Sequence, residues 1–233
     1  MMGDLRGLKR HGCGKSLMGL MLLGAVAVGN ATGLYETGPS QDSSFVRFVN
    51  GTSGDITVHS AKSSGKLPLG TQANTRVSTF QPIRAGQPLE AYIKAGSQQI
   101  PVKVMAKPGE FITVAAVTEG AGKGAVLQMR ETPNAFSASK ASIAAFNFDG
   151  MCASAQVDSE GKTDGVLKSA TLKAVQRRMV SPVKATVQVS CAGKAMGVPL
   201  NLGQLEAGER YSIFVLPQPS APIAVKDAIE SGP

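Results

Sequence analysis

The most constraining feature of this sequence is a succession of short alternating segments separated by glycine-containing turns. The clearest segment, Val183 to Cys191 (VKATVQVSC), alternates apolar and polar residues with period two, which is typical of a half-buried antiparallel strand. Turn pairs recur from Asn50-Gly51 to Ala207-Gly208, in several stretches at intervals of 8–12 residues. This spacing predicts an all-β sandwich or barrel. Gly165 to Arg178 contains helix formers but fits strands about as well, so we treat it as strand.

The chain also contains an internal repeat. Three blocks recur in the same order, and their anchor positions are separated by 97, 98 and 99 residues: Asn50 and Asn147, Pro101 and Pro199, Gly109 and Gly208. A repeat of about a hundred residues is a common size for a β-sandwich domain. We therefore expect two tandem β-sandwich-like domains, at residues 32–131 (with a short N-terminal arm) and 141–233, joined by a linker at residues 132–140.

The first 31 residues have the layout of a secretory signal peptide. The basic residues Arg6, Lys9, Arg10 and Lys15 precede the uncharged run Leu17 to Val28, and small residues lead to a plausible cleavage site after Ala31. The apolar run is too short for a transmembrane helix, which needs about 18 residues or more. We therefore expect export to the periplasm and a mature chain that does not span the membrane.

Removal of residues 1–31 lowers the formal net charge from +8 to +5. The remaining basic residues are scattered, with no stripe of alternating basic and aromatic side chains, so nucleic acid is a poor candidate partner. A mildly basic surface would suit an acidic polymer through long-range attraction, but it is equally consistent with an ordinary soluble surface.

Two cysteines, Cys152 and Cys191, follow the expected signal peptide, and an even pair in an exported chain predicts a disulfide. Cys191 ends the alternating strand on its apolar face. The alternation after Cys152 would turn that residue outward unless the preceding turn redirects it. The repeat offset of 97 relates the pair to Asp55 and Lys94 of the first unit.

The sequence predicts no catalytic, metal-binding or cofactor-binding residues. His59 is the only histidine beyond residue 31. Asp55 would share its strand face but lie about 13 Å away, too far to orient an imidazole for acyl transfer. No G-x-S-x-G elbow is present, and zinc would need more Cys or His ligands. These features predict a protein that is not an enzyme.

The start of the expected mature chain resembles the alginate biosynthesis F protein family (AlgF). The resemblance rests on Leu34-Tyr35, Gly38-Pro39 and the block Ser44 to Arg47 followed by Asn50, in that order. Looser similarity continues through Leu67 to Gly70 and Leu89 to Lys103, and ends at Gly203 to Phe214. These motifs are structural rather than chemical.

The resemblance implies a periplasmic protein of two β-sandwich domains that is required for O-acetylation of the exopolysaccharide alginate. It also implies partners: a membrane acyltransferase and SGNH-type periplasmic acetyltransferases. A second interpretation stays open, a stand-alone polysaccharide-binding module for an acidic exopolysaccharide. The chain has no tryptophan, and only Tyr35, Tyr92 and Tyr211 as tyrosines, so it offers few flat rings for stacking on sugars.

Overall fold

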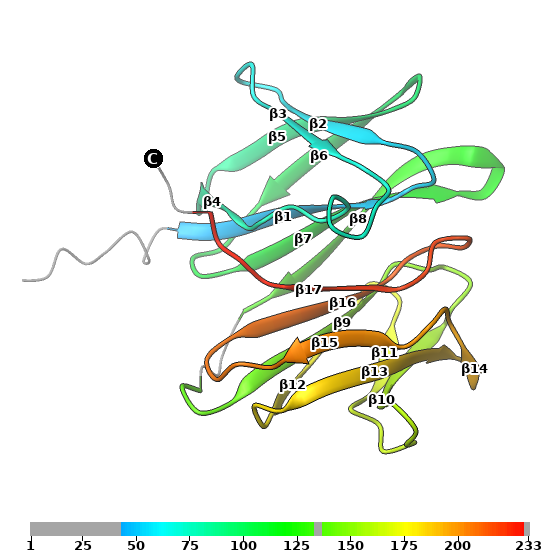
Figure 1. Ribbon diagram of the computed structural model, residues 1–233. Coiled ribbons are helices and arrows are strands. Elements are labelled where there is room, and N and C mark those ends of the chain that lie inside the picture. The colour runs from blue at the N-terminus through cyan, green and yellow to red at the C-terminus, as the bar shows by residue number, and fades with distance from the viewer. Residues whose placement is uncertain (1–42, 133–136, 231–233) are drawn as a thin grey trace, which may run out of the picture. The chain divides into compact units, whose positions relative to one another are not determined.

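The computed structural model describes residues 43–132 and 137–230 (Figure 1). The expected signal peptide, its cleavage site at Ala31 and the arm before Ser43 lie outside the described residues. Across the described ranges, no helix is long and apolar enough to cross a membrane. The same ranges consist almost entirely of strands arranged in several sheets, so the all-β, sandwich-like fold class is confirmed.

The first sandwich consists of two four-stranded sheets whose apolar faces enclose one core. The first inner sheet has the order β4 (Gln81–Arg84), β1 (Ser43–Gly51), β7 (Phe111–Glu119), β8 (Lys123–Glu131), with the 3-10 turn η1 (Gly120–Gly122) between β7 and β8. The first outer sheet has the order β3 (Lys66–Leu69), β2 (Ile56–Ser60), β5 (Pro88–Ala95), β6 (Gln98–Met105).

The second sandwich repeats this arrangement around its own core. The second inner sheet has the order β12 (Val175–Val180), β9 (Ala141–Asn147), β16 (Arg210–Val215), β17 (Ile223–Lys226). The second outer sheet has the order β11 (Leu167–Thr171), β10 (Ser154–Ser159), β13 (Lys184–Cys191), and β13 also pairs with β14 (Lys194–Ala195) and β15 (Leu200–Gln204). Gly165 to Arg178 thus contains β11, most of β12 and the turn between them.

The register of the strands follows the repeat. In the first inner sheet Phe45 pairs with Phe111 across the parallel strands β1 and β7. In the second, Ser142 pairs with Arg210 across β9 and β16. Ser142 follows Phe45 by 97 residues, and Arg210 follows Phe111 by 99 residues. The glycine turns match as well, because the Gly109 amide donates to the carbonyl of Ser43 and the Gly208 amide to that of Lys140.

A third core joins the two sandwiches. The outward-facing side chains of the two inner sheets form one buried cluster, which includes Val49, Ala115 and Met129 from the first and Phe146 and Phe214 from the second. Strands β1, β7, β9 and β16 are therefore covered on both faces, which explains their nearly continuous apolar sequences. In Figure 1, β17 runs beside the first inner sheet, and the chain continues from it toward β4.

Candidate functional site

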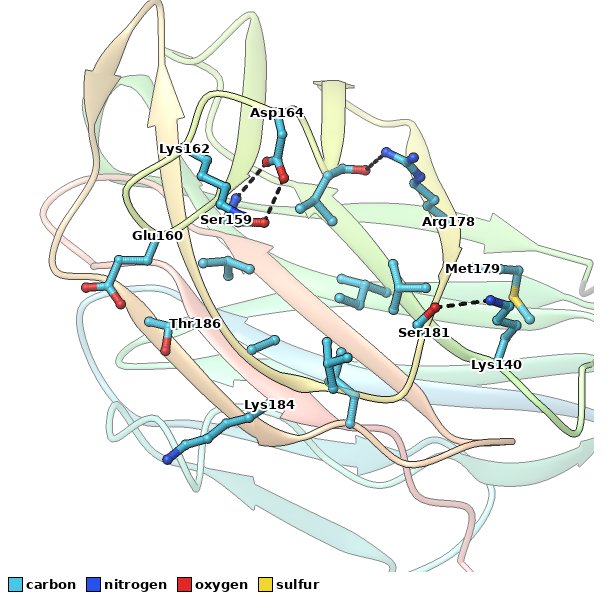
Figure 2. A pocket seen from close by; sticks show the side chains of 17 residues that line it. Lys140, Ser159, Glu160, Lys162, Asp164, Arg178, Met179, Ser181, Lys184 and Thr186 are labelled. Atoms are coloured by element: carbon cyan, nitrogen blue, oxygen red, sulfur yellow. Dashed lines mark hydrogen bonds between the residues drawn. The ribbon is translucent and has the colours of Figure 1, made fainter.

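The second sandwich is open along one side, where the edge strands β11 and β12 are joined by a short turn but are not paired with each other in the described sheets. The opening forms a cleft of about 730 Å³ (Figure 2). Its walls are β12, the β12–β13 connection, the start of β13 and the loop between β10 and β11. Both β11 and β12 are terminal strands of their sheets, so each has one edge without a neighbouring strand in the described sheets.

The floor of the cleft is apolar and continuous with the core of the second sandwich, formed by Ile143, Val166, Val180, Ala185, Val187 and Leu205. Val183 lies at the mouth. The alternating pattern placed Val183 on the buried face of its strand, and that prediction is wrong. Strand β13 begins only at Lys184, and Val183 in the preceding connection is 53% exposed.

The rim of the cleft carries charge of both signs, with the cations Lys140, Lys162, Arg178 and Lys184 and the anions Glu160 and Asp164 (Figure 2). Lys140 Nζ donates to Ser181 Oγ at 3.1 Å, and Arg178 Nη1 donates to the carbonyl oxygens of Gly165 and Val166 at 3.1 and 3.3 Å. The Arg178 bonds tie the loop between β10 and β11 to the side chain of a β12 residue, and the Lys140 bond ties the segment before β9 to the β12–β13 connection. The backbone amide and hydroxyl of Ser159 donate to the Asp164 carboxylate and lower its pKa.

The first sandwich has a matching cleft of about 680 Å³ between β3 and β4. Four of its lining residues hold the positions that line the second cleft: Val46, Ser60, Leu89 and Ala91 correspond to Ile143, Ser159, Ala185 and Val187. The open side is therefore a property of the repeated unit. The two rims differ, since the lining of the first cleft contains only Lys66 and Glu230 as charged residues.

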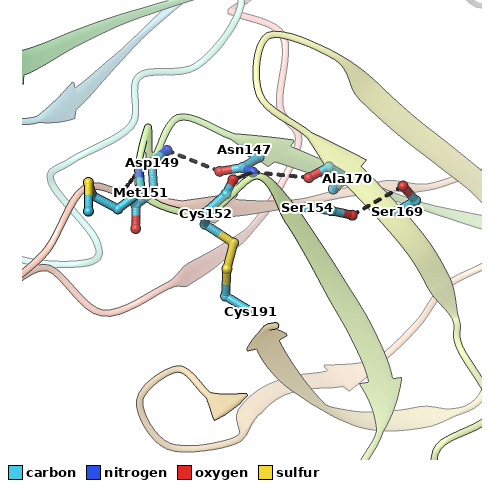
Figure 3. The surroundings of a disulfide bond; sticks show 8 residues. All are labelled: Asn147, Asp149, Met151, Cys152, Ser154, Ser169, Ala170 and Cys191. Atoms are coloured by element: carbon cyan, nitrogen blue, oxygen red, sulfur yellow. Dashed lines mark hydrogen bonds between the residues drawn. A yellow bond between two sulfur atoms is a disulfide. The ribbon is translucent and has the colours of Figure 1, made fainter. Parts of the chain in front are cut away.

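Cys152 and Cys191 form a disulfide with a Cα–Cα separation of 5.8 Å (Figure 3). Cys152 is buried although the alternation after it pointed outward, because it precedes β10 and belongs to a turn. In that turn the Cys152 amide donates to the carbonyl of Asp149. Asn147 Nδ2 then donates to the carbonyl oxygens of Cys152 and Ala170, at 2.7 and 3.0 Å.

The structural equivalents of the two cysteines differ from the predicted ones. Asn50 Nδ2 donates to the carbonyl of Gly54 as Asn147 Nδ2 does to that of Cys152. In the cross-strand register Cys191 corresponds to Ala95. The constant offset of 97, which pointed to Asp55 and Lys94, is therefore wrong for this pair, because the spacing between equivalent residues varies along the repeat.

His59 lies on the solvent-facing side of the first outer sheet, opposite Tyr92 and Lys66. Its ring stacks on that of Tyr92 at a centroid separation of 4.8 Å. Local desolvation, and then repulsion from Lys94 and Lys66, lower its pKa. Among the hydrogen bonds of the described residues, none joins His59 to Asp55. The described ranges also contain no group of three or more His, Cys, Asp or Glu residues that could hold a metal ion.

A buried charge network lies between the sandwiches, and the sequence pattern did not predict it. Arg47 on β1 is 1% exposed, and its guanidinium contacts Thr113, Ser212 and Asp227. Its guanidinium carbon lies 4.3 to 4.9 Å from the ring centroids of Phe80, Phe146 and Phe214. Beside it, Arg177 pairs with Glu131 through both carboxylate oxygens. The only available signal was one arginine inside the apolar run of β1.

No protein-family model matches this chain, and no curated protein matches it in sequence. Among solved structures, a protein from Bacteroides ovatus ATCC 8483 that is provisionally assigned to cell adhesion is 9% identical, with a TM-score of 0.24. The alignment covers 81% of this chain and 99% of that protein. A similarity this weak carries no argument about function. The proposal for function therefore rests on the chemistry of the protein's surfaces.

Proposed function

We propose that this protein is a non-catalytic periplasmic adaptor required for O-acetylation of an exopolysaccharide, alginate by its sequence resemblance. It would act beside a membrane acyltransferase and SGNH-type acetyltransferases. The observation that supports an adaptor best is the cleft of the second sandwich, with its apolar floor, charged rim and flanking terminal strands.

This geometry suits an extended segment of another protein. An exposed sheet edge offers backbone hydrogen bonds to an added strand, and alternate side chains of that strand need apolar pockets. The edge of β12 offers the backbone hydrogen bonds, and the floor around Ile143 and Val187 offers the apolar pockets. The clefts of the two sandwiches give one molecule two places of this kind.

The test is binding of the purified chain to a purified SGNH-type acetyltransferase from the same organism. Val183→Asp places a charge at the mouth of the cleft, and we expect it to weaken binding by about tenfold or more and to reduce polymer acetylation in cells. Val198→Asp is the matched control, because Val198 is 77% exposed and lies outside the cleft lining. Equal affinities of the two variants would rule out the cleft as the docking site.

The second candidate, a stand-alone module for an acidic polysaccharide, is favoured by one observation. The cleft rim carries four cations and two anions. A polyuronate should then bind the purified chain in a salt-sensitive manner, and Lys184→Glu should weaken that binding. Binding of the polymer together with no detectable binding of the acetyltransferase would favour this candidate over the adaptor.

A further inference from the structure

The solvent-facing side of the first outer sheet carries an ordered cross-strand arrangement of side chains. One row, read across β3, β2, β5 and β6, contains Lys66, His59, Tyr92 and Pro101. The next contains Pro68, Thr57, Lys94 and Gln99. Residues directly opposite on paired strands share a face and lie about 5 Å apart, so each row is a continuous strip of surface.

The centre of this face is aromatic and its surroundings are basic. The rings of His59 and Tyr92 are stacked and nearly parallel, with an interplanar angle of 3°. Lys66, Lys94 and Lys103 lie around them, and Glu90 is the acidic residue opposite Lys103, with 3.6 Å between the charged atoms. Met105, on the same side of β6, is 53% exposed.

We propose that this face, centred on Tyr92 and His59, is a second docking surface that binds the acidic surface of a partner protein. Protein interfaces combine an apolar centre rich in Tyr and Met with a polar rim, and aromatic residues at the centre carry most of the binding energy. Exposed Pro101 and Pro68 beside the rings, and exposed Met105 at the end of the same face of β6, give the irregular apolar contacts that suit protein side chains. Three lysines against one glutamate select a partner of negative charge.

The second sandwich provides an internal comparison. In the same cross-strand register the positions of His59 and Tyr92 are occupied by Asp158 and Gln188, and that of Lys94 by Ser190. Gln188 there donates to the backbone carbonyl of Val189. The architecture of the repeat is therefore compatible with polar, uncharged or acidic residues in place of the stacked rings and of Lys94. The stacked aromatic pair with Lys94 beside it is particular to the first sandwich.

This docking surface is an inference beyond the proposed function. Only the choice of the acetyltransferase as a binding probe rests on the proposed function. With that probe, Tyr92→Ser and Lys94→Glu should each weaken binding by about tenfold or more. Gln188→Ser on the second sandwich should leave the affinity unchanged. Binding by the unmodified chain should weaken with added salt, and Lys94→Glu should reduce that dependence. Unfolding curves of the variants show whether each is folded.

A second measurement separates the two proposals. A photo-crosslinking amino acid replaces Tyr92 in one variant and Gln188 in the other, and crosslinks formed in living cells are identified. A crosslink from position 92 to a specific acidic protein, abolished by Lys94→Glu, supports the docking surface. If the acetyltransferase does not bind in the same experiments, only the proposed role in acetylation is contradicted. Acetyltransferase binding that is insensitive to both Tyr92→Ser and Lys94→Glu overturns the surface and leaves the adaptor role intact. Tyr92-dependent binding of a polyuronate without any protein crosslink overturns the choice of a protein partner.

Discussion

The guanidinium of Arg47 donates a 2.7 Å hydrogen bond to the carboxylate of Asp227, which lies 180 residues further along the chain. Both side chains are at most 5% exposed. Arg177 and Arg210 approach the other carboxylate oxygen of Asp227 at 3.6 and 3.8 Å. The contact between the two sandwiches thus combines an apolar core with a buried group of charges.

Replacement of Arg47 by methionine should destabilise the protein by about 3–5 kcal/mol, because it leaves Asp227 buried without its closest counter-charge. Arg84→Met is the control, since Arg84 is exposed on β4, and it should change stability by no more than about 0.5 kcal/mol. Chemical unfolding of both variants measures the difference. Similar losses in the two would show that the Arg47 contact contributes little.

The stability of the wild-type protein should fall in acid partly through Asp227. Burial alone would raise the pKa of Asp227, but the attraction of Arg47 and the other nearby arginines outweighs it, so the folded pKa lies below the ordinary value. The stabilisation is therefore complete above about pH 4, the unfolded pKa of aspartate, and is lost as the pH falls through the lower folded pKa.

Asp227→Asn should be less stable at neutral pH and should lose less further stability below about pH 4. Unfolding measured at a series of pH values gives the two slopes. Parallel curves for wild type and variant would contradict a depressed pKa at this carboxyl.

Removal of the disulfide should destabilise the second sandwich. Closing a loop between residues 39 positions apart corresponds to roughly 4 kcal/mol in the chain-entropy model. The double variant Cys152→Ala, Cys191→Ala should unfold at lower denaturant, and a reductant should destabilise the wild type but not the variant. Mass mapping without reduction checks the pairing, and two free thiols in the purified protein would refute it.

The side-chain amides of Asn50 and Asn147 should contribute more to the free energy of unfolding than the amide of an ordinary surface asparagine. Asn50 Nδ2 donates to the carbonyls of Gly54, Leu69 and Gly70, and Asn147 makes the two equivalent bonds described above. Each alanine substitution removes the Nδ2 donor from carbonyl oxygens that are buried or partly buried, and should cost about 1–3 kcal/mol. Asn201→Ala is the control, since Asn201 is exposed and only accepts the Gly203 amide. Comparable losses at all three positions would contradict the assigned roles.

The sequence was sufficient for the parts of the fold that depend on local pattern. Period-two alternation predicted the strand that ends at Cys191, and the repeated Asn, Pro and Gly positions predicted a duplicated unit. The same alternation failed at Val183 and at Cys152. At each of these positions the strand had not yet begun, and a turn set the direction of the side chain.

Contacts between distant segments could not be predicted from local pattern. Arg47 lies in an apolar run, but nothing near it in sequence identifies Asp227 as its partner. The His59–Tyr92 stack and the cleft beside β12 likewise depend on which strands are neighbours and which edges stay open. A single sequence shows which residues are suited to strands, whereas the pairing of those strands decides which side chains meet.

Because Arg47 and Asp227 are far apart in sequence, their ion pair can form only late in synthesis. The ribosome makes Arg47 and the first sandwich well before Asp227, and the backbone contacts of Phe80 with Ala228 and Glu230 are made by the same late segment. Until then the outward face of the first inner sheet has neither its apolar cover nor the counter-charge of Arg47. Between the completion of β8 at Glu131 and the synthesis of Asp227, the nascent chain therefore presents an incompletely covered apolar surface that contains the Arg47 cation. A chaperone that shields such surfaces would be of most use during that interval.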